Sequence, residues 1–460
     1  ISTTSGGSNT VVGADAMFSN TTGANNVAIG LDALFANTTA SNNTAVGKES
    51  LKANTTGDSN SAFGEASLFS NTTGGNNTSI GRGSLESNTT GDNNTSVGKD
   101  ALKANTTGTQ NVAIGTLAMD ANTTGSFNTS VGYNSLTSNT TGRNTAFGHT
   151  ALATVTTGTQ NTGIGDNTLA SNTASNNTAL GYAALNANTT GTRNTAIGAN
   201  AGDAITDGLA NALVGNNAGG GGNFSTGVAV GDNALLVNTG NNNTAVGQES
   251  MVANTSGSEN TAVGQGALGS NTTAIDNTAV GRDALALNTT GNENTALGKD
   301  ALSANTTGTN NLSLGSDTML ANTTGSNNVA VGYGALQVNS TADDNTAVGD
   351  RALFNNTTGA NNSALGHDAL KANTTGDQNT AVGSFALDAN TTAGNHVAIG
   401  YAALTQNTTG QRNTAVGALS SQEMTTGDDN VAMGYLSLGA NTTGTENTAV
   451  GANALDANTT

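Results

Sequence analysis

The sequence predicts an all-β fold: a parallel β-solenoid (β-roll) of about 27 coils with seventeen residues per coil. A glycine that follows an apolar triplet recurs along the chain from Gly13 to Gly451, in most steps at every seventeenth position. Each triplet alternates in side-chain character, which is typical of a strand. Gly and Asn-Thr-Thr interrupt the apolar segments too often for a helix. Because a three-residue strand is stable only when stacked on copies of itself, the fixed period favours a solenoid.

The repeat divides the chain into 27 units joined by 26 intervals. Twenty-two intervals have the full length of seventeen and four are shorter by one residue, and the four short ones lie between Gly132 and Gly247. A typical unit reads Asn-Thr-Thr-Gly, two variable residues, Asn-Thr-Ala-Val-Gly, two variable residues and Ala-Leu-x-Ala. At a strand spacing of ~4.8 Å, the coils would form a rod roughly 130 Å long.

We expect one continuous repeat domain, with regular coils at 1–198 and 241–460 and irregular, Gly-rich coils at 199–240. In the irregular segment, glycine replaces leucine in two successive units. Glycine is useful where backbones bend or approach closely. This segment is therefore predicted to bend, thin or carry a site. The candidates to fill the space of the missing leucines are Ile205, Leu209 and Phe224.

Two apolar ladders are predicted to form the core. The outer residues of each triplet would face inward and meet the Leu of Ala-Leu across a thin interior; the representatives are Val27, Val112, Ile29, Ile114, Leu34 and Leu102. The middle residue is small nearly throughout, which indicates that something packs closely on its face. We expect other copies of the chain to do so, with Ala28, Ala113 and Ala330 as the candidate interface.

An asparagine precedes each unit Gly by four residues in 25 of the 27 units, and Gly227 and His396 are the exceptions. A side-chain amide can bond the same amide one coil along, and Asn tolerates a left-handed corner. We therefore predict a structural asparagine ladder, represented by Asn26, Asn43, Asn94 and Asn111.

The motifs "NVAIG" (111–115) and "NTAVGxxAL" resemble the head repeats of trimeric autotransporter adhesins, and the Asn-Thr-Thr-Gly units resemble repeats of phage-type tail-fibre proteins. The resemblance covers essentially the whole chain. It implies a β-roll, left-handed in the adhesin heads, that assembles as a homotrimer and serves attachment outside the cell. The adhesin units are a few residues shorter, and this sequence shows no coiled-coil stalk, membrane-anchor barrel or self-cleaving chaperone domain.

Composition excludes several functions. Twelve Lys and Arg against 31 Asp and Glu give a net charge of −19, which disfavours nucleic acid and anionic membranes. There is no apolar run long enough to insert into a membrane. With no Cys and three dispersed His, the sequence offers no clustered acid, base or nucleophile. We expect no enzyme activity, no catalytic residues, no cofactor and no metal site.

Other residues leave two interpretations open. The five Tyr each follow a unit Gly; they are Tyr133, Tyr182, Tyr333, Tyr401 and Tyr435. They are either ordinary solvent-exposed residues or residues that contact a host surface or glycan. His149 and His367 are expected to be solvated corner residues. The acidic corners at 343–344 and 428–429 are either solvated turns or a calcium site. The Asn-Thr-Thr triplets are turns or glycosylation acceptors.

We therefore expect an extracellular or cell- or virion-surface fibre, structural or adhesive, that assembles with itself. The alternative is an ice- or surface-binding solenoid that uses ranks of Thr from Asn-Thr-Thr. The chain starts and stops partway through a unit. Either it is a segment of a longer protein, or Thr460 of one subunit meets Ile1 of the next in a head-to-tail filament.

Overall fold

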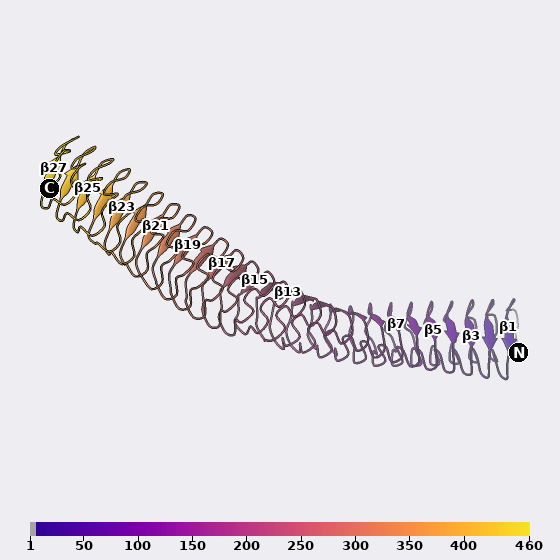
Figure 1. The fold of residues 1–460 in the computed structure, drawn as a ribbon. Coiled ribbons are helices and arrows are strands. Elements are labelled where there is room, and N and C mark those ends of the chain that lie inside the picture. Colours follow the sequence, from indigo (N-terminus) through magenta and orange to yellow (C-terminus); the bar gives the residue numbers. More distant parts are fainter. Residues whose placement is uncertain (1–5) are drawn as a thin grey trace. The chain divides into compact units, whose positions relative to one another are not determined.

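The computed structural model describes residues 6–460, and these residues form 27 parallel strands of three residues each and no helix. The chain divides into two compact units, which end and begin at Gly227 and Val228. This boundary falls inside the irregular segment 199–240. The predicted all-β parallel solenoid, with seventeen residues in a regular turn, is confirmed. Figure 1 shows the coils of each unit stacked one above another, with the strands aligned on one side.

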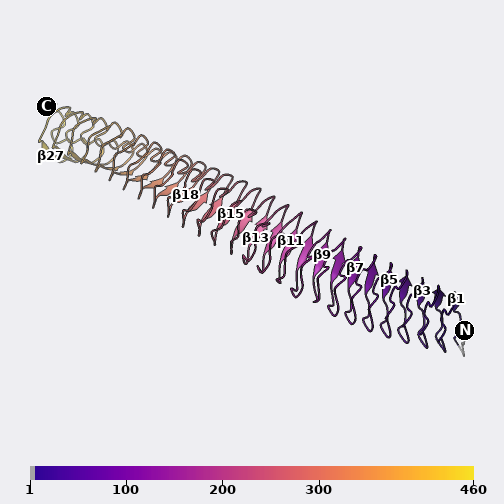
Figure 2. The ribbon, with the colours of Figure 1, turned by 90° about the horizontal axis from the view of Figure 1, so that it is seen from below.

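The first unit contains 13 of the strands in the described part of the chain. They are β1 (Thr10–Val12), β2 (Val27–Ile29), β3 (Thr44–Val46), β4 (Ser61–Phe63), β5 (Thr78–Ile80), β6 (Thr95–Val97), β7 (Val112–Ile114), β8 (Thr129–Val131), β9 (Thr145–Phe147), β10 (Thr162–Ile164), β11 (Thr178–Leu180), β12 (Thr195–Ile197) and β13 (Ala212–Val214). Figure 2 shows these strands side by side along the stack.

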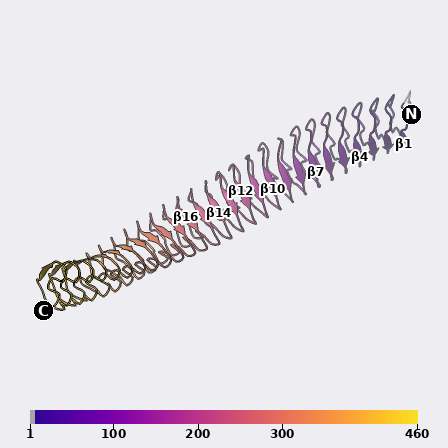
Figure 3. The same cartoon turned by 90° about the horizontal axis from the view of Figure 1, so that it is seen from above.

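The second unit contains the remaining 14 strands of the described residues. They are β14 (Val228–Val230), β15 (Thr244–Val246), β16 (Thr261–Val263), β17 (Thr278–Val280), β18 (Thr295–Leu297), β19 (Leu312–Leu314), β20 (Val329–Val331), β21 (Thr346–Val348), β22 (Ser363–Leu365), β23 (Thr380–Val382), β24 (Val397–Ile399), β25 (Thr414–Val416), β26 (Val431–Met433) and β27 (Thr448–Val450). Figure 3 shows the coils of each unit from the opposite side.

The register is the same at each strand pair within a unit: equivalent residues lie opposite each other. In β7 and β8, for example, Val112 pairs with Thr129 and Ala113 with Ser130. The turns follow the same rule, because Leu102 N–H donates to Ala118 C=O of the next coil at 2.9 Å. Each kind of side chain therefore forms a column along the stack.

The unit glycine is required by its backbone and by its neighbour. Gly98 has a φ of +142°, which L side chains rarely adopt. A Cβ at this position would lie 2.5 Å from the carbonyl oxygen of Gly115 in the next coil. This close approach explains why the residue that directly follows each triplet is Gly.

The interior of each coil is thin and is filled by leucine and alanine. Leu34 and Leu102 are fully buried, as the sequence indicates. The middle residue of the strand faces this leucine. At Gly163, which replaces the usual Ala, an added Cβ would lie 3.2 Å from Leu152 Cγ. There is consequently room inside for only a small side chain at the centre of the strand.

The predicted orientation of the triplet is therefore wrong. Ala28, Ala113 and Ala330 are fully buried within their own coils and are not available to a partner. The outer positions point outward instead: the equivalents Val27 and Val112 are half-buried, and Ile29 and Ile114 are 38% and 39% exposed. The small middle residue does mark close packing, but its packing partner is leucine of the same chain.

Candidate functional site

One regular surface feature is the strand face, the outward surface formed by the first and third residues of the strands. In the first unit, its third-residue column carries exposed aliphatic and aromatic side chains in most coils; the exposed members are Val12, Ile29, Phe63, Ile80, Ile114, Phe147, Ile164, Leu180, Ile197 and Val214. The first-residue column is mostly Thr and Val. None of the 27 described strands contains a charged residue.

The same arrangement recurs in the second unit. Exposed third residues there include Val230, Val263, Leu297, Leu365, Ile399, Met433 and Val450. Solvated sheet faces usually alternate apolar inward with polar outward side chains. Here, a chain of net charge −19 keeps its charges on the turns and leaves the strand face neutral. The strand face is thus the candidate contact surface of each unit.

Buried asparagines anchor the strand to the turn. Asn43 Oδ1 accepts the backbone N–H of Asn60 at 2.8 Å, and Asn94 Nδ2 donates to Gly108 C=O at 2.9 Å. Asn111 N–H donates to Asn94 Oδ1 at 3.0 Å, and Asn26 is likewise buried. The ladder residues therefore bond mainly to backbone groups of the next coil. The left-handed conformation belongs to the residue before them, such as Asn93 with a φ of 60°.

A second asparagine ladder runs through the first residue of Asn-Thr-Thr, and the sequence analysis did not predict it. Asn105 Nδ2 donates to Asn88 Oδ1 of the previous coil at 2.8 Å and to Gly108 C=O at 3.0 Å. The sequence feature that could have predicted this ladder is the recurrence of Asn as the first residue of Asn-Thr-Thr. Where Ile205 interrupts the column, Asn188 Oδ1 is left without a partner.

Burial of both asparagine columns bears on glycosylation. Asn105 and Asn111 are fully buried, as are most of their equivalents in the described coils. An oligosaccharide on a side-chain nitrogen that lies inside the coil would not fit this fold. The structure therefore favours the turn interpretation of Asn-Thr-Thr.

The five tyrosines lie at the Gly corner, the surface formed by the residues that directly follow each unit Gly. Their exposed fractions run from 49% at Tyr133 to 56% at Tyr182, Tyr333 and Tyr401, with Tyr435 at 51%. Tyr133 stacks on His149 with ring centroids 5.6 Å apart. Tyr401 contacts Phe385, whose ring also meets His367. Within each unit, neighbouring tyrosines are at least two coils apart, so they do not gather into one site.

The remaining histidine, His396, is different because it replaces a ladder asparagine and is fully buried. Its Nδ1 accepts the backbone N–H of Asn413 at 3.2 Å. Burial lowers the pKa of His396 from 6.5 to about 4. The imidazole thus stays neutral at physiological pH and reproduces the acceptor of the asparagine.

The acidic corners are used for structure. Asp428 Oδ1 accepts the backbone N–H of Gln411 one coil earlier at 2.7 Å, and Asp343 accepts that of Ser326 in the same way. Asp429 binds Arg412 through two bonds of 2.7 and 2.8 Å, and this partner lowers the pKa of the carboxyl. In residues 6–460, no group of three or more His, Asp or Glu could hold a metal ion.

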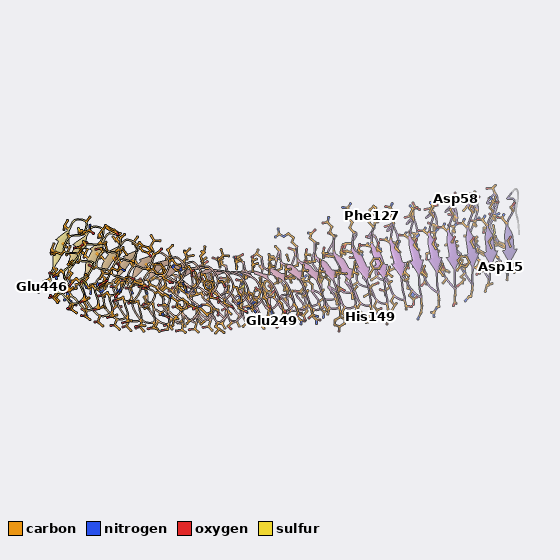
Figure 4. All side chains as sticks on the ribbon, turned by 45° about the horizontal axis from the view of Figure 1, so that its top comes forward. Asp15, Asp58, Phe127, His149, Glu249 and Glu446 are labelled. Atoms are coloured by element: carbon orange, nitrogen blue, oxygen red, sulfur yellow. The ribbon has the colours of Figure 1, made fainter. Side chains whose placement is uncertain are left out.

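The coil stack of the first unit has two opposite edges. Figure 4 places Asp58 and Phe127 along one edge of the first unit and Asp15 and His149 along the opposite edge. We call the first of these the turn edge, formed by the Asn-Thr-Thr-Gly segments and the two variable residues after them. In this segment, Thr106 Oγ1 donates to Thr123 C=O one coil on. The first Thr hydroxyl of Asn-Thr-Thr is thus engaged by the backbone.

The irregular segment of the first unit repacks its core. Ile205 and Phe224 are buried at the space left by Gly202 and Gly219, whereas Leu209 is 38% exposed and does not fill it. The sequence analysis missed Leu213. This residue stands where other strands carry Ala, and its Cδ1 lies 2.7 Å from the position that a Cβ on Gly202 would occupy. Leu213, on the strand side of the coil, therefore fills part of the space that the two missing leucines would occupy.

Comparison with protein-family models gives no match, and no curated protein matches the sequence. Within the described residues, no helix is long and apolar enough to cross a membrane.

Proposed function

We propose that the protein is a structural fibre protein whose copies associate side by side through the strand face. The observation that carries the proposal is the column of exposed apolar third residues, repeated in each unit on a face without charge. Contiguous exposed apolar surface of this kind marks interaction sites. A second copy of the same chain is the fitting occupant, because its columns have the same repeat and meet the first in register.

Charge favours this face over the others. Identical chains of net charge −19 repel each other, so association is favoured at a surface from which the charges are absent. The turn edge and the Gly corner carry acidic side chains, such as Asp58 and Asp166. The trimeric state, the adhesive role and the location outside the cell are proposals that rest on the resemblance to adhesin and tail-fibre repeats.

An ice- or surface-binding solenoid is the second candidate, and it also involves the strand face. The first residue of most strands is Thr, so outward Thr side chains form a column beside the apolar one. The Thr of Asn-Thr-Thr are less suitable, since they lie on a bend and the first hydroxyl bonds the backbone. Thermal hysteresis of freezing in the wild-type protein would favour this candidate over the fibre.

Sedimentation velocity tests the side-by-side proposal. The variant has three changes on the strand face: Ile80→Asp, Ile114→Asp and Ile164→Asp. Its control adds the same charge to exposed turn positions of the same coils: Thr73→Asp, Thr107→Asp and Thr157→Asp. We expect the wild-type chain and the control to be oligomers and the strand-face variant to be a folded monomer, checked by circular dichroism. A monomeric wild-type chain, or three identical distributions, would contradict the proposal.

A further inference from the structure

A shallow pocket of about 570 Å³ lies on the turn edge of the first unit, between residues 124 and 160. This volume is in the range of ordinary small-molecule sites. Its lining comes from three successive coils and combines hydroxyl groups with an aromatic ring, a guanidinium group and an amide; the side chains that matter are Ser126, Phe127, Thr141, Arg143, Thr159 and Gln160. Phe127 is labelled on this edge in Figure 4.

The pocket exists because the middle coil is short. The interval between Gly132 and Gly148 is one residue shorter than the usual interval, and the missing residue comes from the turn, which reads Asn-Thr-Thr-Gly-Arg-Asn in place of the longer form. Its backbone draws in against the previous coil. A Cβ on Gly142 would lie 2.3 Å from the carbonyl oxygen of Ser126. The retracted turn leaves a hollow between the two full-length turns on either side.

The functional groups at this hollow are available to a ligand. Phe127 is 55% exposed, and Arg143 Cζ lies 5.9 Å from the centre of its ring. Among the described residues, no carboxylate forms an ion pair with Arg143. Lys52 also lies over an aromatic ring, that of Phe69, but its charge is already paired. Asp32 and Glu49 both form ion pairs with Lys52 at 2.9 Å.

We propose that this pocket binds a carboxylate-bearing sugar residue, such as a hexuronic acid. The guanidinium of Arg143 would hold the carboxylate through charge-assisted hydrogen bonds. The ring of Phe127 offers an apolar face to the C–H groups of the pyranose. The hydroxyl of Thr159 and the amide of Gln160 supply donors and acceptors for the sugar hydroxyls.

The combination selects this ligand class against simpler ones. A neutral sugar would not use the charge of Arg143, and an inorganic phosphate would not use the ring of Phe127. The rest of this chain is acidic, so anions are attracted only where a cation is unpaired. The pocket lies on the turn edge, away from the strand face, and the inference is independent of side-by-side association.

Saturation-transfer NMR on the full chain tests the inference with three probes: methyl β-D-glucuronide, methyl β-D-glucoside and inorganic phosphate, the last followed by its ³¹P line width. We expect saturation transfer to the glucuronide and roughly tenfold weaker binding of the glucoside, since a hydrogen bond to a charged group contributes about that factor. Raised salt should weaken glucuronide binding.

Four variants locate the site. Arg143→Gln should reduce glucuronide affinity to that of the glucoside, and Phe127→Ala should abolish binding of both. The matched controls are Arg193→Gln, an exposed arginine in the equivalent place of a coil without an aromatic neighbour, and Phe69→Ala; both should bind as wild type. Equal binding of glucuronide and glucoside, wild-type affinity in Arg143→Gln, or binding of phosphate as tight as glucuronide would overturn the inference, as would no saturation transfer at all.

Discussion

At the scale of single residues, the coil depends on left-handed backbone positions occupied by ordinary side chains. Each regular coil has three of them, represented by Asn93, Asp100 and Leu102 with φ values of 60°, 55° and 50°. This conformation costs an L residue roughly 1–2 kcal/mol, and β-branched residues adopt it least readily. The buried position four residues after the unit Gly, which Leu102 represents, is accordingly Leu or Met in nearly all units and never Ile or Val.

This constraint gives a prediction for Leu102→Ile, which keeps side-chain volume and hydrophobicity. We expect Ile to destabilise the coil by about 1–2 kcal/mol more than Leu102→Met does, because Met occurs at the same place as Met119. Hydrogen exchange of the amides around β7 measures the difference locally. Equal protection in the two variants would show that the left-handed backbone does not select against branching.

His396 makes one coil sensitive to acid. Its pKa is about 4 in the folded chain against 6.5 for the free side chain. The unfolded state therefore binds the proton first, and folding stability falls as the pH drops from 6.5 toward 4, by roughly 3 kcal/mol at most. Above pH 6.5 the residue contributes no pH dependence.

The matched variant is His396→Asn, which restores the usual ladder residue. Melting temperatures of the two proteins should differ more at pH 4 than at pH 7, with the variant being the more stable at pH 4. Both proteins share their carboxylates, so the difference isolates the imidazole. A difference that does not depend on pH would contradict the role assigned to its neutral form.

At the scale of elements, the sequence predicts each strand and misplaces its faces. The period and the turn residues locate the triplets because a glycine with φ near +140° and a close neighbour is required directly after each of them. Alternation shows that Ala113 and Ile114 lie on opposite faces, but it does not show which face is inside. That depends on how much room Leu102 leaves across the coil, which is a property of the folded cross-section.

In the irregular coils too, the size of the side chain at the centre of the strand depends on the residue that faces it across the coil. Leu213 occupies the space that leucines at Gly202 and Gly219 would otherwise take. We expect Leu213→Ala to leave a cavity and to destabilise these coils by about 2–5 kcal/mol. Val214→Ala is the control, since the same strand presents Val214 outward at 39% exposure. Hydrogen exchange around β12 and β13 should separate the two variants, and equal effects would contradict the repacking.

At the scale of the whole molecule, repetition of the coil produces extended surfaces and not one localised binding site. A residue placed outward in one coil recurs in the next, so each unit carries a continuous apolar column of third strand residues. The pocket at Phe127 and Arg143 could not be predicted from the repeat, because it arises where one turn loses a residue. The missing residue is visible in the sequence, but the hollow depends on how far the backbone retracts.

The most direct test of the central claim uses the absence of cysteine from the chain. A single cysteine is placed on the strand face in Ile114→Cys or on the turn edge of the same coil in Thr107→Cys, and each protein is oxidised under mild conditions. Association through the strand face predicts rapid disulfide-linked dimers from Ile114→Cys and few from Thr107→Cys, as measured by non-reducing electrophoresis. Equal cross-linking, or faster cross-linking at the turn edge, would contradict it.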